Sequence, residues 1–372
     1  MKKKGLAVIY DPHNLYQFVW YYCNKGKEKE WDALCLPNGY KGEYMHTYCE
    51  AAGIFQNIYR DDVDFLVLPL RKKMQIFLKM FIYFVAGRRI SYCRKFINQY
   101  VREKDYDEIV VLCDYGVVSG ACCALGKEKE VVILEDGIGD YGERPRFIPL
   151  SKIWSFFYWQ GFFLAAMGYC GKGLFRTNTS RYCIKYSSHP DQMIYKKFKE
   201  IRLLYDDKGT DEALFNRIVE RIYPSLRNYD FQNAEVVIMT RPLEDYVANV
   251  DRYKQRFEAY VHKNYNDVLL KKHPREEGQY NFGTNVRTVE IDNSIPAEAI
   301  FPYVKGKDFL IIEVSSVILY ANTYRMRCIA VSFDGLYEEC IKSGSTFRPG
   351  NKNEQIDFYE KFVNNNYRIV HL

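Results

Sequence analysis

The chain has few residues that break regular structure and no cysteine pattern that would staple a small secreted domain. Its 372 residues include only 23 Gly and 12 Pro, scattered without a low-complexity run or a fixed-period repeat, which excludes disordered and solenoid proteins. Its 11 Cys are odd in number and form no Cys-x-x-Cys motif. We therefore expect reduced thiols, with Cys122 and Cys123 packed in a core, in a globular protein long enough for two domains.

The sequence also lacks a long apolar run. Three lysines follow Met1, but the apolar stretch after them, 5–10, ends at Asp11, whereas a secretory signal needs a longer stretch and a cleavage site. Two further apolar runs, 74–85 and 153–169, are short for a helix that spans a membrane. These absences predict a cytoplasmic protein.

Positive charge is concentrated in one stretch. The net charge is only +6, yet residues 71–104 contain ten Lys or Arg and a single acid, Glu103. One interpretation is buried helices with solvated basic ends. The other is a basic, aromatic surface, which includes the run 153–169 and contacts the anionic inner face of a membrane as a peripheral protein. Nucleic acid is not an expected partner, because no recognition motif accompanies the charge.

Common cofactor and metal motifs are missing as well. The sequence has no Gly-rich dinucleotide fingerprint, no P-loop and no Ser nucleophile elbow. Its six His are isolated, and no Asp-x-Asp follows a predicted strand in the way that metal-dependent nucleotide-sugar transferases use. The sequence therefore predicts neither a resident cofactor nor a metal site.

Short apolar runs alternate with helical patterns along the whole chain. The runs are 6–10, 65–68, 108–112, 131–134, 183–186, 235–239, 268–270, 286–291, 309–314 and 328–331. Helical patterns include 94–104, 252–263, 336–342 and 354–364. This alternation predicts an α/β protein of two Rossmann-like domains, 1–190 and 191–372, which face a central cleft and join within 187–230. Ligands of such sheets bind beyond the carboxyl ends of the strands.

Two adjacent acids follow the predicted strand 131–134. Glu135 and Asp136 precede Gly137, which puts a carboxylate on a turn at the expected cleft edge. Such a carboxylate can take a proton from a sugar hydroxyl. An ordinary loop or helix cap explains the same pattern.

A histidine among cations follows the predicted strand 268–270. Pro274 fixes the turn after His273, while Lys272 and Arg275 make the surroundings cationic. This environment suits a phosphate, which the imidazole can bind or protonate; a plain surface histidine is the alternative. A second His-Pro, at His189, lacks the basic flank.

Two further polar groups lie near predicted strand ends in the second half. Glu298 could bind the paired hydroxyls of a ribose or simply be an acid at a helix N-terminus. Ser315 and Ser316 follow the strand 309–314, where they could bind an anion or act as a helix N-cap.

The order of these clusters resembles that of bacterial sialyltransferases, above all the lipooligosaccharide sialyltransferases of glycosyltransferase family 52 and the related polysialyltransferases. Those families share an acid-acid-Gly motif, then His-Pro, then an acid on the nucleotide ribose and paired serines. The matches here are Glu135-Asp136-Gly137, His273-Pro274, Glu298 and Ser315-Ser316. The Lys-x-His-Pro-Arg context is most similar to the lipooligosaccharide group.

The resemblance implies the GT-B architecture and an inverting, metal-independent sialyltransferase of lipooligosaccharide or polysaccharide biosynthesis. The donor would be CMP-sialic acid, and the acceptor a terminal sugar, galactose by expectation, on a glycolipid or polysaccharide. His273 and the paired serines would bind the departing phosphate, Glu298 would bind the ribose, and Lys272, Pro274 and Arg275 would complete the donor site. Related enzymes also make a homodimer the expected assembly.

Three questions stay open at this point. The base could be Glu135, favoured by its position in the motif, or Asp136, or Asp245, which follows the predicted strand 235–239. The donor could be another CMP-sugar such as CMP-Kdo. A non-catalytic protein that binds glycan or membrane on the same fold is the alternative of a different class.

Overall fold

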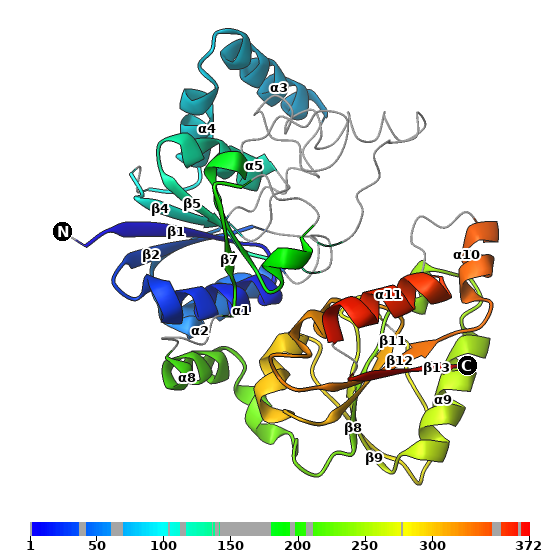
Figure 1. The fold of residues 1–372 in the computed structure, drawn as a ribbon. Helices are drawn as coiled ribbons and strands as arrows, with labels where there is room; N and C mark the ends of the chain where they lie inside the picture. Colours follow the sequence, from blue (N-terminus) through cyan, green and yellow to red (C-terminus); the bar gives the residue numbers. More distant parts are fainter. Residues whose placement is uncertain are drawn as a thin grey trace. The chain divides into compact units, whose positions relative to one another are not determined.

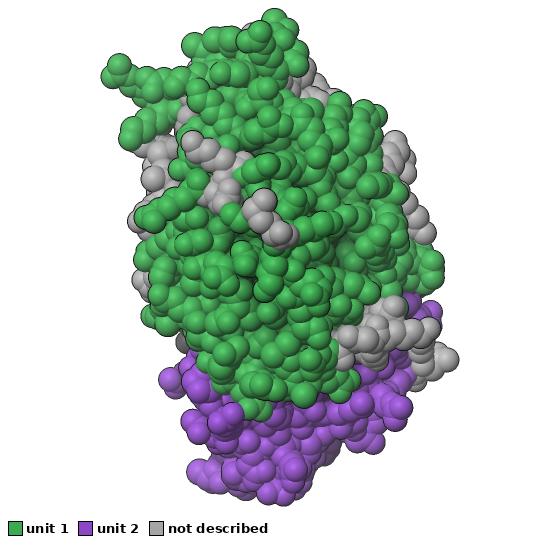
Figure 2. Space-filling model, turned by 90° about the vertical axis from the view of Figure 1, so that its left-hand side faces the viewer, with its two compact units in different colours: residues 1–222 green, residues 223–372 purple. Residues whose placement is uncertain are grey.

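The chain folds into two compact units. The computed structural model describes residues 2–36, 42–60, 70–102, 105–111, 117–135, 137, 141, 180–193, 198–205, 211–276, 278–343, 351–363 and 366–372. Unit 1 is Met1–Ile222 and unit 2 is Tyr223–Leu372, drawn in green and purple in Figure 2. Each unit has its own parallel sheet and its own hydrophobic core.

Unit 1 is built on a seven-stranded sheet in the order β3-β2-β1-β4-β5-β6-β7 (Figure 1). Its strands are β1 (Lys4–Ile9), β2 (Glu30–Cys35), β3 (Phe55–Arg60), β4 (Glu108–Val111), β5 (Glu130–Ile133), β6 (Ile184–Ser187) and β7 (Glu200–Leu203). All neighbouring strands pair in parallel. The central strands are buried almost throughout, as expected for a parallel sheet that is covered on both faces.

The helices of unit 1 are α1 (Pro12–Tyr21), α2 (Gly42–Ala52), α3 (Leu70–Val85), α4 (Arg89–Ile97), α5 (Val117–Ala124) and α8 (Glu212–Ile222). Helix α1 begins directly after β1, where the Asp11 carboxylate accepts the Asn14 N–H at 2.8 Å and Pro12 takes the first helical position. Helices α4 and α5 pack Phe96 and Cys122 into the core beside β4 and β5.

Unit 2 has a six-stranded parallel sheet in the order β10-β9-β8-β11-β12-β13 (Figure 1). Its strands are β8 (Val236–Met239), β9 (Asp267–Lys271), β10 (Arg287–Glu290), β11 (Asp308–Ile312), β12 (Arg327–Ser332) and β13 (Tyr367–His371). Its helices are α9 (Asp251–Asn264), α10 (Leu336–Ser343) and α11 (Lys352–Val363), with short 3-10 turns η7 (Leu243–Asp245), η8 (Ala297–Tyr303) and η9 (Ser316–Tyr320).

Both sheets have the Rossmann strand order, which reverses direction at one point. The reversal lies between β1 and β4 in unit 1 and between β8 and β11 in unit 2. Ligands of such sheets bind at this switch point, beyond the carboxyl ends of the strands. The prediction of an α/β protein with two Rossmann-like domains is confirmed.

Several predicted elements differ from the structure. Strands β2, β3, β7 and β13 were not predicted, and the predicted strand 65–68 lies outside the described residues. The helix predicted over 94–104 is α4, which begins at Arg89 and ends at Ile97. The chain divides after Ile222 rather than after residue 190, because β7 pairs with β6 and α8 packs on α1 and α2 of unit 1.

Strand β3, which was not predicted, bears on the prediction that no Asp-x-Asp sequence follows a strand. It ends at Arg60, so Asp62-Val63-Asp64 is an Asp-x-Asp sequence that follows a strand after all; these aspartates lie outside the described residues. Within the described part of the chain, no group of three His, Cys, Asp or Glu side chains is placed to hold a metal. No helix there is long and apolar enough to cross a membrane, and the nine described cysteines are buried free thiols.

Candidate functional site

The carboxyl edge of the unit 2 sheet brings together the clusters that follow β8, β9 and β11. Thr240 and Arg241 follow β8, residues 272–276 follow β9, and residues 313–316 follow β11. Since β8 and β11 are the two strands at the switch point, these three segments surround the place where such a sheet binds its ligand.

His273 is held in a tight turn beside β8. Its N–H donates to the Thr240 hydroxyl at 3.2 Å, and its carbonyl accepts the Glu276 N–H at 2.9 Å. The Arg275 N–H donates to Nδ1 of the imidazole at 3.2 Å, so in the neutral ring Nε2 carries the proton. Burial, together with the charges of Arg275, Arg241 and Lys271, lowers the pKa of His273 to about 4. At neutral pH His273 is therefore an uncharged hydrogen-bond donor through Nε2.

The residues on either side of His273 have different surroundings. Arg275 pairs with the candidate base Asp245 of η7 at 2.9 Å, which brings a carboxylate to the same turn. Lys272 is buried, and its ammonium group contacts Glu290 of β10 at 2.8 Å and the Gly278 carbonyl at 3.4 Å. Lys272 thus ties β9 to β10, while Pro274 is exposed on the turn.

The turn is supported by a buried carboxylate that the sequence did not single out. Glu276 accepts hydrogen bonds from Thr240 and from the Tyr280 hydroxyl, the latter at 2.6 Å. Burial raises the pKa of Glu276 above its usual value. Because Thr240 also accepts from the His273 N–H, one hydroxyl links Glu276 to the backbone of the histidine.

The paired serines enter the site from β11. Ser315 is extended, with φ −129° and ψ 150°, and its side chain makes no capping hydrogen bond to η9. Both serines are half-buried. The N-cap explanation for Ser315 therefore has no support in this geometry.

Glu298 and Glu313 are two further buried acids of unit 2. Glu298 is the second residue of η8 and is 5% exposed. Glu313, the residue directly after β11, is 1% exposed, and burial raises the pKa of its carboxyl to about 7. Glu313 was not among the predicted site residues, although an acid at the end of an apolar strand, just before two serines, was a signal for it.

In unit 1, the acid-acid-Gly cluster lies at the end of β5. Glu135 is 0% exposed, and its carboxylate accepts the Ser188 N–H at 2.9 Å and the Ser188 hydroxyl at 2.6 Å, besides the hydroxyls of Ser187 and Tyr141. Gly137 has a left-handed backbone with φ 69°, which glycine adopts without steric cost. Asp136 lies outside the described residues.

The second His-Pro belongs to this unit 1 cluster. Ser187 is the last residue of β6, the neighbour of β5, and residues 188–190 follow it, so Ser187 and Ser188 reach Glu135. The His189 N–H donates to the Tyr141 hydroxyl at 3.1 Å, and the two rings pack edge to face with centroids 6.0 Å apart. The structure therefore gives this motif a place at the carboxyl edge of its own sheet.

Residues 68–331, most of the chain, match the family model described as alpha-2,8-polysialyltransferase (POLYST). The chain belongs to the alpha-2,8-polysialyltransferase family. The matched span includes both the Glu135 cluster and the whole edge of unit 2 from Asp245 to Ser316. The predicted relation to sialyltransferases is thereby confirmed, whereas membership of the lipooligosaccharide group stays a prediction.

Comparisons of this polysialyltransferase-family chain with curated proteins and with solved structures give only distant similarities or none. No curated protein matches it. Similar solved structures include the glycosyltransferase SnogD from Streptomyces nogalater (13% identity, 92% of this chain and 86% of that one, TM-score 0.45). They also include UDP-N-acetylglucosamine 2-epimerase from Rickettsia bellii (12%, 95% and 91%, 0.46) and MurG from Acinetobacter baumannii (9%, 100% and 86%, 0.45). These TM-scores are below 0.5, and the fold assignment rests on the two sheets themselves.

Proposed function

We propose that this member of the polysialyltransferase family transfers sialic acid from CMP-sialic acid to a terminal sugar, galactose by expectation, of a glycolipid or polysaccharide. The observation that carries the proposal is His273, a neutral Nε2–H donor beside the cations Arg241 and Arg275 at the switch point of unit 2. A hydrogen-bond donor in a cationic, half-buried setting suits the single phosphate of a departing CMP.

The proposed transfer is a single displacement at the anomeric carbon of sialic acid. An acceptor hydroxyl oxygen forms a bond to the anomeric carbon of sialic acid while the bond from that carbon to the phosphate oxygen breaks, with inversion. The electron pair stays on the phosphate, where His273 Nε2–H and the hydroxyls of Ser315 and Ser316 stabilise it. The proton of the acceptor goes to a carboxylate, and Glu298 binds the ribose hydroxyls.

Metal independence is part of the same proposal. CMP leaves with one phosphate, so less charge develops than with a diphosphate. The cationic groups near His273, together with its Nε2–H, are suited to a charge of this size. Lys272 has a different part in the proposal, because it pairs with Glu290 and so stabilises the strand end that carries His273.

The experiment measures CMP release from CMP-sialic acid with a galactoside acceptor. The wild-type chain should release CMP, and His273→Ala should lower kcat by about two to four orders of magnitude, the usual range for such groups. His46→Ala is the control, since His46 lies on α2 of unit 1 and pairs with Glu50 of the same helix in a surface contact of 3.5 Å. Wild-type protein that neither binds CMP nor releases it with any acceptor would refute the proposal. If CMP is released from CMP-Kdo but not from CMP-sialic acid, the donor is CMP-Kdo and the proposed donor is wrong.

A further inference from the structure

The backbone at the end of β11 has an unusual conformation. Glu313 has φ 55°, and among the described residues only Arg325 is another non-glycine residue with positive φ. This left-handed region is strained for a residue with a side chain. Such strain persists only where the surroundings fix it, and it concentrates at functional sites.

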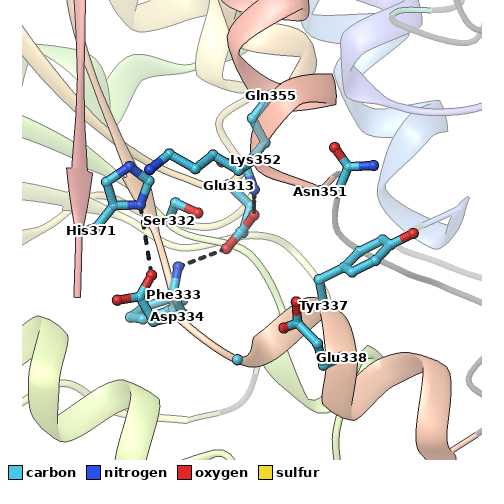
Figure 3. Close-up of a pocket in the computed structure, with 11 residues that line it drawn as sticks. Glu313, Ser332, Phe333, Asp334, Tyr337, Glu338, Asn351, Lys352, Gln355 and His371 are labelled. Atoms are coloured by element: carbon cyan, nitrogen blue, oxygen red, sulfur yellow. Dashed lines mark hydrogen bonds and ion pairs between the residues drawn. The ribbon is translucent and has the colours of Figure 1, made fainter.

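The surroundings of Glu313 fix both its side chain and its backbone. The carboxylate accepts the Phe333 N–H, just after β12, at 3.2 Å and a hydrogen bond from the Gln355 amide of α11 (Figure 3). The carbonyl of Glu313 accepts the Tyr359 hydroxyl, also of α11, at 3.0 Å. The N–H of Glu313 donates to the Val331 carbonyl of β12 at 2.8 Å. One residue thus joins β11 to β12 and α11.

The next residue is held from the opposite side. Arg241, which follows β8, donates to the Val314 carbonyl and lies over the ring of Tyr246 at 5.5 Å. The two residues before Ser315 are therefore fixed from both sides of the switch point. Any change at Glu313 that frees this turn displaces the serine hydroxyls.

We propose that Glu313 is a positioning residue of the donor site, whose buried hydrogen bonds hold the turn in the left-handed conformation that presents Ser315 and Ser316 to the CMP phosphate. The inference rests on the proposed function, since it takes these two serines as phosphate ligands. In this proposal Glu313 acts through the turn and does not bind the donor itself, since its carboxylate is engaged by the Phe333 N–H and the Gln355 amide.

The test compares CMP binding by three variants in calorimetric titrations of the full chain. Glu313→Gly fits the left-handed backbone but loses the side-chain hydrogen bonds, and we expect the Kd for CMP to rise about tenfold or more. Glu313→Gln keeps an oxygen for the Phe333 N–H, and the Gln355 amide can rotate to match it, so its Kd should stay within about threefold of wild type. Glu313→Ala combines strain with lost hydrogen bonds and should bind most weakly.

Two controls separate positioning from general damage. Glu313 and Glu338 of α10 both line the pocket drawn in Figure 3, but Glu338 is exposed. Glu338→Gln removes this exposed carboxylate and should leave the Kd for CMP unchanged. Tyr359→Phe removes only the hydrogen bond to the Glu313 carbonyl and should raise the Kd by a few-fold. The far-UV spectrum and thermal midpoint of each variant establish that it is folded; if Glu313→Ala does not fold, Glu313→Gly carries the test.

The outcomes are distinct. Folded Glu313→Gly protein with a wild-type Kd overturns the positioning role, as does equal weakening in Glu313→Gln and Glu313→Gly, because rescue by the amide is then absent. Failure of the proposed function looks different, since wild-type protein itself would not bind CMP, and the inference about Glu313 would fall with it.

Discussion

At the scale of the residue, burial changes what a carboxylate can do. Glu135 and Asp245 are both candidates for the base, but Glu135 is surrounded by Ser187, Ser188 and Tyr141, whereas Asp245 is half-buried and paired with Arg275. A base must contact the hydroxyl that it deprotonates. The hydrogen bonds around Glu135 hold its carboxylate in one orientation, whereas the Asp245 carboxylate is engaged by the Arg275 guanidinium.

We therefore expect Glu135→Gln to lower kcat by about 100-fold or more while the thermal midpoint stays near that of wild type, because the isosteric amide keeps an oxygen for the Ser188 N–H but cannot take a proton. Asp245→Asn should keep most of the turnover, and Asp136→Asn tests the remaining acid. Steady-state CMP release measures all three variants. If Glu135→Gln turns over normally and Asp245→Asn does not, the base lies in unit 2 and Glu135 is only an anchor of the β5 end.

At the scale of the element, the buried apolar strands were predictable, whereas three of the four edge strands were not; the edge strand β10, predicted over 286–291, is the exception. The runs behind β1, β4, β5, β8, β11 and β12 are buried on both faces, so hydrophobicity alone identifies them. Strands β3, β7 and β13 lie at the sheet edges, and none of their residues is buried. Strand β2 is central, but Asp32 interrupts its apolar run; that buried carboxylate accepts from Tyr106 at 2.8 Å and from Asn57.

The sequence could locate the individual residues of the candidate site but not the contacts between them. His273 and the paired serines could be located because they follow apolar strands, and strand ends of a parallel sheet meet at one edge. The contacts between segments could not: Arg275 with Asp245, Arg241 with Val314 and Glu313 with α11 each depend on how distant segments pack. A left-handed glutamate has no signature in the sequence either, since glycine is the usual residue there.

Helix α3 favours the membrane interpretation of the basic stretch. Leu78, Ile82 and Val85 are 57%, 56% and 69% exposed, at spacings that place them on one side of a helix. Arg71, Lys72 and Lys79 of the same helix are exposed as well. An apolar strip beside basic side chains is typical of helices that lie in the interface of an anionic membrane; the other run, 153–169, lies outside the described residues.

We expect the chain to co-sediment with vesicles that contain phosphatidylserine, and the binding to weaken as salt is raised. Replacing Leu78, Ile82 and Val85 together by Ser should reduce the bound fraction about tenfold, whereas Ile341→Ser on α10, which removes another exposed apolar side chain, should not. Absent or salt-independent binding would contradict the role of α3 and favour a helix that is covered by protein.

At the scale of the whole molecule, the roles proposed for donor binding and for proton removal fall in different units. The residues proposed to bind the donor, from Lys272 to Ser316, lie in unit 2, together with Glu313 and the helix α11 that holds it. Unit 2 also has a continuous core of its own, in which Phe257, Leu270 and Val331 pack together. The Glu135 cluster lies wholly within unit 1. Donor binding and proton removal are therefore separable properties if the proposed roles are right.

The separation predicts the behaviour of residues 223–372 expressed alone. Because this segment has its own sheet and core, we expect it to fold and to bind CMP with a Kd within about tenfold of the full chain, a difference of about 1.4 kcal/mol. It should not transfer sialic acid, since Glu135 and Asp136 are missing. His273→Ala in the same segment is the matched control and should weaken CMP binding further. A folded segment that does not bind CMP would mean that residues of unit 1 also contact the donor, and the assignment of the donor site to the β8–β11 switch point would then be incomplete.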